Sequence, residues 1–96
     1  MGDPEGPSSG LIARAPREVL LFERAQRDLM DLPAVERAML ATHIDGLALD
    51  ALPRGAEVLH GRHRDHFRLR VGRFRVLYRV SDGELTIAAI TAENSW

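Results

Sequence analysis

The sequence predicts an α+β domain in which two helices are followed by an antiparallel meander of strands. Two observations support this prediction. Up to residue 49, apolar side chains recur at helical spacing on either side of a Leu-Pro break at 32–33. From residue 67 onward, apolar and polar side chains alternate along 67–71 and 74–80, a third apolar run follows at 84–90, and two-residue turn sequences containing glycine separate the runs.

The chain has 96 residues, which is enough for one small domain. Its first ten residues are Met, Gly, Pro, Ser and acidic residues, so we expect residues 1–15 to be a disordered tail and residues 16–96 to form one domain. The absence of cysteine excludes disulfides and thiolate chemistry. No apolar run approaches the roughly 20 residues that cross a bilayer, and the N-terminus lacks the pattern of a signal peptide. We therefore expect a cytoplasmic protein that neither spans nor binds a membrane.

Residues 11–32 allow two interpretations. In the first, a helix runs from Pro16 to Leu32 with four apolar side chains near one face. In the second, residues 18–22 (EVLLF) form a short buried strand and the helix begins at Glu23. The dense apolar run slightly favours the strand, but periodicity alone leaves both interpretations open.

Pro33 suits the first turn of a second helix, which we expect to end near Leu49. An apolar stripe along this helix should face the core, formed by Val35, Met39, Ile44 and Leu47. Residues 50–58 (DALPRGAEV) are expected to be a loop.

The Gly72-Arg73 dipeptide sets the register of the hairpin around it. Glycine at the first turn position fits a type II′ turn, and Asp82-Gly83 indicates a type I′ turn before the last strand. A two-residue turn at 72–73 places Arg70 opposite Arg75. One face of the hairpin then carries apolar side chains that pack on the helices, namely Phe67, Leu69, Val71, Phe74, Val76, Tyr78 and Val80. The opposite face carries Arg68, Arg70, Arg75 and Arg79.

Positive charge is concentrated between residues 60 and 79, although the whole chain has a net charge of −1. This stretch holds seven arginines, three histidines and one aspartate, and every basic residue of the chain is an arginine. Arginine presents a planar fork that suits phosphate, and it does not act as a general base at neutral pH. A local basic block in a nearly neutral protein indicates a binding site.

Arg70 and Arg75 form an unfavourable pair if nothing lies between them. The Cβ atoms of opposed residues are about 5 Å apart, and two like charges held there repel each other by roughly 1–3 kcal/mol. The arrangement favours an anion between the two guanidinium groups, while the alternative is a solvated basic surface. An extended RNA or DNA backbone fits this row of arginines better than a single phosphate does, because the chain has no glycine-rich phosphate loop.

Three histidines, His60, His63 and His66, recur at a regular spacing before the hairpin. Arg62 and Arg64 interleave with them and would repel a dication, and no cysteine completes a ligand set, so we expect no metal and no other cofactor. His63 or His66 could act as a general acid or base beside the arginines, because histidine titrates near neutral pH. The simplest alternative is that all three belong to a polar loop.

Two stretches carry a family resemblance. Residues 25–33 (AQRDLMDLP) follow the pattern Ala-x-x-Asp-Leu-x-x-Leu-Pro, and residues 59–87 contain Leu-x-Gly followed by Arg-x-Arg-Val-Gly-x-Phe-Arg-Val-x-Tyr. Over residues 18–91 the chain resembles the RelE/ParE superfamily of toxins from bacterial type II toxin–antitoxin systems. The resemblance implies two N-terminal helices packed on a twisted, mainly antiparallel four-stranded sheet, and it favours residues 18–22 as the first strand.

The resemblance also implies an activity. RelE-type toxins cleave mRNA in the ribosomal A site without a metal, and the ribose 2′-oxygen attacks the adjacent phosphate. The paired basic residues of such a site match Arg68 and Arg70, and the hairpin arginine that stabilises the pentavalent phosphorus matches Arg75. Further contacts to the RNA are expected from Arg73, Arg79 and Trp96, the last by stacking on a base.

The C-terminus departs from the RelE pattern. Active members follow the last strand with a basic segment and a nearby tyrosine, whereas this chain has Thr91, Ala92, Glu93 and Asn94 at those positions. The binding half of the site is therefore present while the catalytic half lacks its usual residues, and a histidine of the preceding loop could substitute. Two alternatives follow, a ParE-like inhibitor of DNA gyrase that is not an enzyme, and an inactive module that binds RNA or an antitoxin.

The resemblance implies an antitoxin partner besides the ribosome and mRNA, and toxin–antitoxin heterotetramers are common in the superfamily. By simple alternation, Leu77 and Ile90 should lie on the arginine side of the sheet. Apolar side chains there need cover, either from the C-terminal segment of the chain or from the antitoxin.

Overall fold

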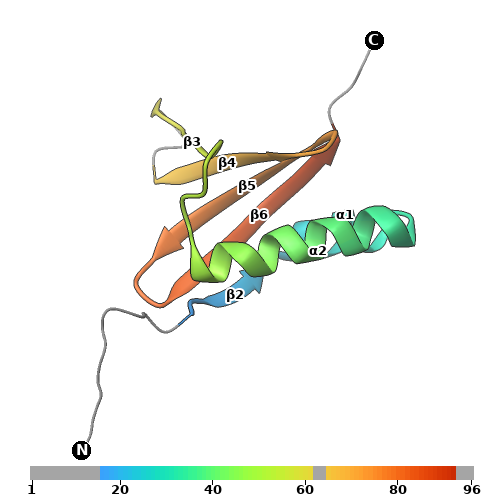
Figure 1. Cartoon of the computed structure of the whole chain (residues 1–96), viewed down its shortest axis with the longest axis horizontal. Helices are drawn as coiled ribbons and strands as arrows, with labels where there is room; N and C mark the ends of the chain where they lie inside the picture. Colours follow the sequence, from blue (N-terminus) through green and yellow to red (C-terminus); the bar gives the residue numbers. More distant parts are fainter. Residues whose placement is uncertain (1–15, 62–64, 93–96) are drawn as a thin grey trace, which may run out of the picture.

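The computed structural model describes residues 16–61 and 65–92, which form a five-stranded sheet with two helices on one face (Figure 1). In chain order the elements are β2 (Glu18–Leu21), α1 (Glu23–Met30), α2 (Ala34–Leu49), β3 (Glu57–Val58), β4 (His66–Val71), β5 (Phe74–Ser81) and β6 (Glu84–Ala92). The strand order is β2-β6-β5-β4-β3, with β2 parallel to β6 and the other pairs antiparallel. The α+β architecture is confirmed. The sheet has five strands instead of the expected four, because residues 50–58, which were expected to be a loop, contain β3.

The N-terminal segment is a strand followed by a helix, and a helix from Pro16 onward is excluded. β2 pairs with the first half of β6, and the partly buried side chains of Val19 and Leu21 pack against the core. The backbone N–H of Phe22 donates to the carbonyl of Ile87 at 3.0 Å. The apolar run forms a strand because β6 supplies partners for its backbone, and periodicity along the sequence does not reveal such a partner.

α2 begins directly after Pro33, as the Leu-Pro break predicts. Its buried side chains are Leu40, Ile44 and Leu47. Val35, which the sequence places in the same stripe, is 82% exposed. The predicted stripe is wrong at this position because five residues of helix rotate Val35 about 140° away from Leu40.

The hairpin has the predicted register. Arg70 lies opposite Arg75, and Gly72 has a φ of +59°, as a type II′ turn requires at its first position. All seven side chains of the predicted apolar face are buried or partly buried. The type I′ prediction for the next turn is wrong, because only Gly83 of the Asp82-Gly83 pair has a positive φ, of +78°. Glycine adopts this left-handed conformation without the strain that aspartate would add.

A β-bulge in β6 changes which side chains face the core. Between the pairs Tyr78–Ile87 and Leu77–Ala89, β6 contains one extra residue. Beyond the bulge the alternation is reversed, and Ile90 is buried in the core with 5% exposure. The prediction that Ile90 lies on the arginine side is wrong for this reason, whereas Leu77 does lie there.

The helices cover one face of the sheet, and in the described part of the chain no helix covers the other (Figure 1). On the covered face, Tyr78 is fully buried and its hydroxyl donates to the carbonyl of Ala51 at 2.8 Å. Neither helix among the described residues has the length and apolar composition needed to cross a membrane. The sheet therefore has a core face and an open face, and the candidate site lies on the open one.

Candidate functional site

Strands β4 and β5 place basic side chains in rows across the open face. Side chains two residues apart on a strand point to the same face, and the register sets each residue of β4 beside a residue of β5. His66 lies beside Arg79, and Arg70 lies beside Arg75. We call this surface the arginine face, and it is defined by His66, Arg68, Arg70, Arg75, Leu77 and Arg79.

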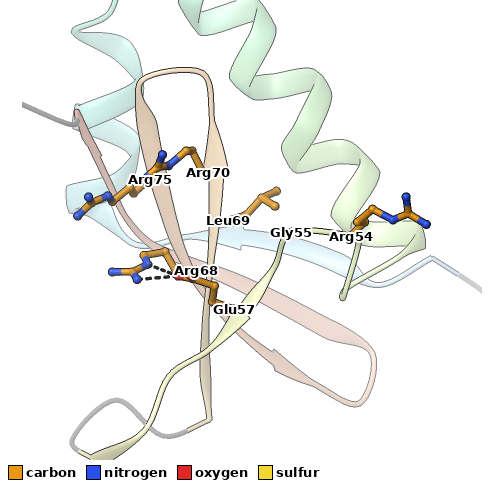
Figure 2. Close-up of a pocket in the computed structure, with 7 residues that line it drawn as sticks. All are labelled: Arg54, Gly55, Glu57, Arg68, Leu69, Arg70 and Arg75. Atoms are coloured by element: carbon orange, nitrogen blue, oxygen red, sulfur yellow. Dashed lines mark hydrogen bonds and ion pairs between the residues drawn. The ribbon is translucent and has the colours of Figure 1, made fainter. Parts of the chain in front are cut away.

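A cleft of about 340 Å³ lies along β4. Its lining residues are Arg54, Gly55, Glu57, Arg68, Leu69, Arg70 and Arg75. Figure 2 shows the side chains of Arg68, Arg70 and Arg75 extending to one side of the hairpin, whereas Leu69 points to the other side. Arg54 comes from the loop after α2, and its guanidinium points away from the other three arginines (Figure 2). The structure thus brings together the three arginines that the sequence analysis assigns to one site.

Glu57 belongs to the cleft, although the sequence analysis did not identify it. It is the register partner of Arg68 across β3 and β4, and its Oε1 accepts hydrogen bonds from Arg68 Nε at 2.9 Å and Nη2 at 2.6 Å. These bonds, followed by the positive charges of Arg68, Arg70 and Arg75, hold the pKa of the Glu57 carboxyl below its usual value. A strand of two residues has no alternation that sequence analysis could detect.

Arg73 lies at the hairpin tip but turns toward α2 rather than toward the cleft. Its Nε and Nη2 donate to the two carboxylate oxygens of Glu36 at 2.9 and 3.0 Å, and its guanidinium carbon lies 4.5 Å from the centre of the Phe74 ring. Because Phe74 is buried in the core face, these contacts anchor Arg73 on the helix side of the turn. The structure therefore does not group Arg73 with the three arginines of the cleft, and its contact to RNA stays a prediction.

His66 and Arg79 occupy the opposite end of the arginine face. They line a separate depression of about 570 Å³ together with Asp65, Phe67, Val80 and Ser81. Four residues of extended strand, about 13 Å, separate His66 from Arg70, so the structure does not bring His66 next to the opposed arginines. His63 and Trp96, which are also expected in the site, lie outside the described residues.

The chemistry of the cleft follows from its side chains. Glu57 is the one carboxylate among the described residues that line it, and none of these residues is a histidine. Thr91 of β6 lies opposite Arg75, where the resemblance would place a basic segment. Within residues 16–61 and 65–92, no three His, Asp or Glu side chains are grouped so that they could hold a metal ion. The cleft therefore contains three guanidinium groups, of which that of Arg68 is bound to Glu57, and one carboxylate that can accept a proton.

No family model and no curated protein matches the chain. Among solved structures, a chain of the toxin–antitoxin complex RelBE2 from Mycobacterium tuberculosis is 28% identical, with a TM-score of 0.75 and coverage of 83% of this chain and 94% of that chain. A chain of the archaeal RelE–RelB complex from Pyrococcus horikoshii is 23% identical, with a TM-score of 0.74 and coverage of 85% and 100%. The isolated RelE toxin of E. coli is 13% identical, with a TM-score of 0.72 and coverage of 83% and 87%. These similarities confirm the resemblance seen in the sequence, and the chain has the fold of the RelE/ParE-like toxin superfamily.

Proposed function

We propose that the chain is the toxin of a type II toxin–antitoxin system and cleaves mRNA on the ribosome, in the cytoplasm, without a metal. One observation carries this proposal. Arg68, Arg70 and Arg75 lie together on a sheet face that no helix covers in the described residues, in a chain with the fold of RelE toxins. Guanidinium groups held on a rigid sheet match the phosphates of an RNA backbone in charge and geometry.

In the proposed reaction, the 2′-oxygen of a ribose forms a bond to the neighbouring phosphorus, and the bond from this phosphorus to the 5′-oxygen of the next nucleotide breaks. The phosphate gains negative charge on the way. Arg70 and Arg75, opposed across the hairpin, stabilise this charge, and Arg68 binds the adjoining backbone.

Arginine does not accept the proton of the 2′-hydroxyl at neutral pH. Glu57, which lies in the cleft beside these arginines, can take it up, and the departing 5′-oxygen takes a proton from solvent. His66 lies about 13 Å from Arg70 along β4, so it is a candidate only for a phosphate bound at its own end of the arginine face. His63 stays a further candidate for this proton transfer. Arg73, Arg79 and Trp96 stay proposed contacts to the RNA.

We also propose an antitoxin partner. Several similar structures are toxin–antitoxin complexes, and one of them is a heterotetrameric YoeB–YefM complex from Staphylococcus aureus. On the open face, Leu77 lies among the arginines. Leu20 of β2 is 37% exposed on the same face, where Thr86 of β6 lies between it and Arg79. A segment with acidic and apolar side chains would cover both kinds of group and mask the cleft.

One observation favours a second function, that of a ParE-like gyrase inhibitor without enzymatic activity. Thr91 faces Arg75 where RelE-type sites carry a basic segment, so the cleft has fewer groups for catalysis than such a site. The short first helix, of eight residues, favours the RelE-like function over the ParE-like one.

Translation of a reporter mRNA in a purified system, followed by primer extension, separates these functions. Cuts in the A site that require ribosomes, disappear in R75A and persist in the exposed α1 variant R27A support the proposed function. Uncut mRNA together with inhibition of gyrase supercoiling would establish the second function. Uncut mRNA without gyrase inhibition, with harmless overexpression, would indicate an inactive binding module.

A further inference from the structure

The side chains of the arginine face repeat at a regular spacing along the strands, but the positive charges do not. Side chains that share this face lie in three rows about 7 Å apart along the strands, a step similar to that between neighbouring phosphates of an extended single strand. The rows pair Arg70 with Arg75, Arg68 with Leu77, and His66 with Arg79. Both outer rows therefore carry two basic groups, and the middle row carries one.

The carboxylate of Glu57 cancels the single positive charge of the middle row, that of Arg68. It extends this row onto β3 as the register partner of Arg68. Both hydrogen bonds from Arg68 end on the same carboxylate oxygen, and 40% of the Arg68 side chain and 60% of the Glu57 side chain are exposed. The ion pair is therefore accessible to a ligand, and its two charges cancel each other in the middle row.

A carboxylate oxygen and a phosphate oxygen are alternative acceptors for the same guanidinium group. Glu57 thus occupies the place of the middle phosphate if an RNA backbone follows β4 from Arg70 to His66. Carboxylate and phosphate together at Arg68 would bring two negative charges into contact. Because an exposed ion pair contributes little stability, a polyanion held by both outer rows can displace the carboxylate.

We propose that Glu57 is a specificity-determining residue that competes with RNA for Arg68. The arginine face then favours a backbone that reaches both the Arg70–Arg75 row and the His66–Arg79 row, and it disfavours shorter anions, which gain too little to displace Glu57. This inference rests on the proposed function, because it takes RNA as the ligand. It adds that an acidic residue inside the site selects ligands by their length.

Asp45 provides a control for the change in charge. It is an exposed aspartate on α2, outside the cleft. E57Q and D45N therefore make the same change in charge, and only E57Q makes it inside the proposed site. E36Q does not serve here, because it would release Arg73, which is itself a proposed contact to RNA.

The experiment measures the affinity of the full chain for a fluorescent single-stranded RNA of about ten nucleotides with 2′-O-methyl riboses, over a series of salt concentrations. The methyl groups prevent attack by the 2′-oxygen. E57Q should bind about three- to tenfold more tightly than the wild type at low salt. Its plot of log affinity against log salt should steepen by about 0.7, the value for one more phosphate contact to a single strand. D45N with this RNA should change the affinity less than about twofold. E57Q with a dinucleotide that has one phosphate should gain at least as much as it does with the longer RNA, because a short anion can then bind Arg68 without displacing a carboxylate.

Equal gains from E57Q and D45N would show that net charge alone matters, and would overturn the proposal. A dinucleotide that gains nothing from E57Q would overturn the selection by length. Weaker binding by E57Q would overturn it as well, because Glu57 would then position Arg68 for RNA. Circular dichroism melts check that the fold is intact, and E57A must show the same gain as E57Q. If the wild type binds RNA and E57Q binds no better, the inference fails while the proposed function stands. If neither binds RNA, the inference fails, and the cleavage assay with ribosomes decides the proposed function separately.

Discussion

The carboxylate of Asp28 in α1 accepts a hydrogen bond from the backbone N–H of Ile90 in β6, with 3.2 Å between Oδ2 and the nitrogen. This N–H lies beyond the part of β6 that pairs with β2, since that pairing ends at Ile87. The aspartate of the first-helix motif therefore satisfies a backbone donor for which the sheet supplies no neighbouring strand.

We expect D28A to lower the free energy of unfolding by about 1–2 kcal/mol, because it leaves this partly buried donor without its acceptor. D28N keeps an oxygen at the same place and should lose less. Urea denaturation measures both variants. D45A changes an exposed aspartate of α2 and should stay within about 0.5 kcal/mol of the wild type. A D28A protein as stable as D45A would contradict the proposed role of this hydrogen bond.

R75A tests the catalytic role of the opposed arginines. Loss of one guanidinium should slow cleavage in the A site about 100-fold or more, because the charge that develops on the phosphate loses a fixed partner. Arg75 is partly buried, and the free energy of unfolding should change by about 1 kcal/mol or less, as for charged groups that stay in contact with solvent. R75K keeps the charge without the planar fork and should fall between R75A and the wild type. The rate of cleavage is measured by primer extension, with R27A as the control. A wild-type rate in R75A would refute the catalytic role of Arg75.

The Glu36–Arg73 ion pair ties the hairpin tip to α2, and its contribution should depend on pH. The hydrogen bonds from Arg73 lower the pKa of Glu36 from 4.5. A carboxyl whose pKa is lowered by folding contributes stability above its unfolded pKa, and the contribution is lost as the pH falls through the folded value. The wild type should therefore be more stable than E36Q at neutral pH, and this difference should shrink below pH 4.5. Urea denaturation of both proteins from neutral to acidic pH measures it, and a difference that does not vary with pH would contradict the role of the ionised carboxylate.

Local patterns predicted most of the fold because the corresponding structures depend on local geometry. The length of the turn at Gly72 is enough to place Arg70 opposite Arg75. The bulge in β6 adds a residue without any sequence signal, so counting alternate residues through it puts Ile90 on the wrong face. The strand β2 forms because β6 lies beside it, more than 60 residues later in the chain.

The candidate site was predictable to the same extent. Three arginines of its cleft follow from the hairpin register alone. The partners of the charged groups do not, because Arg68 pairs with a glutamate 11 residues away and Arg73 with one 37 residues away. Those pairings depend on where α2 and the loop after it lie in three dimensions, and no local pattern encodes that placement.

Tyr78 offers an alkaline test of the core. The chain has one tyrosine, no cysteine and no lysine, so no other side chain titrates near pH 10. The side chain is fully buried, and its hydroxyl donates to the carbonyl of Ala51 at 2.8 Å. Burial, with a smaller effect from the charge of Asp50, raises its pKa from 10.0 to about 12.

Folding therefore holds the phenol proton more tightly than the unfolded chain does, and the stability that this confers is present below pH 10.0 and is lost as the pH rises toward 12. Y78F removes both the titration and the hydrogen bond. It should be less stable than the wild type by about 1 kcal/mol at neutral pH. The wild type should lose this advantage and become less stable than Y78F as the pH rises from 10.0 toward 12, because a shift of two pKa units corresponds to about 2.7 kcal/mol. Denaturant titrations at a series of alkaline pH values measure this, and phenolate absorbance reports the ionisation directly. Phenolate absorbance that reaches its midpoint at pH 10.0 in the folded wild type would contradict the burial of Tyr78 as the cause.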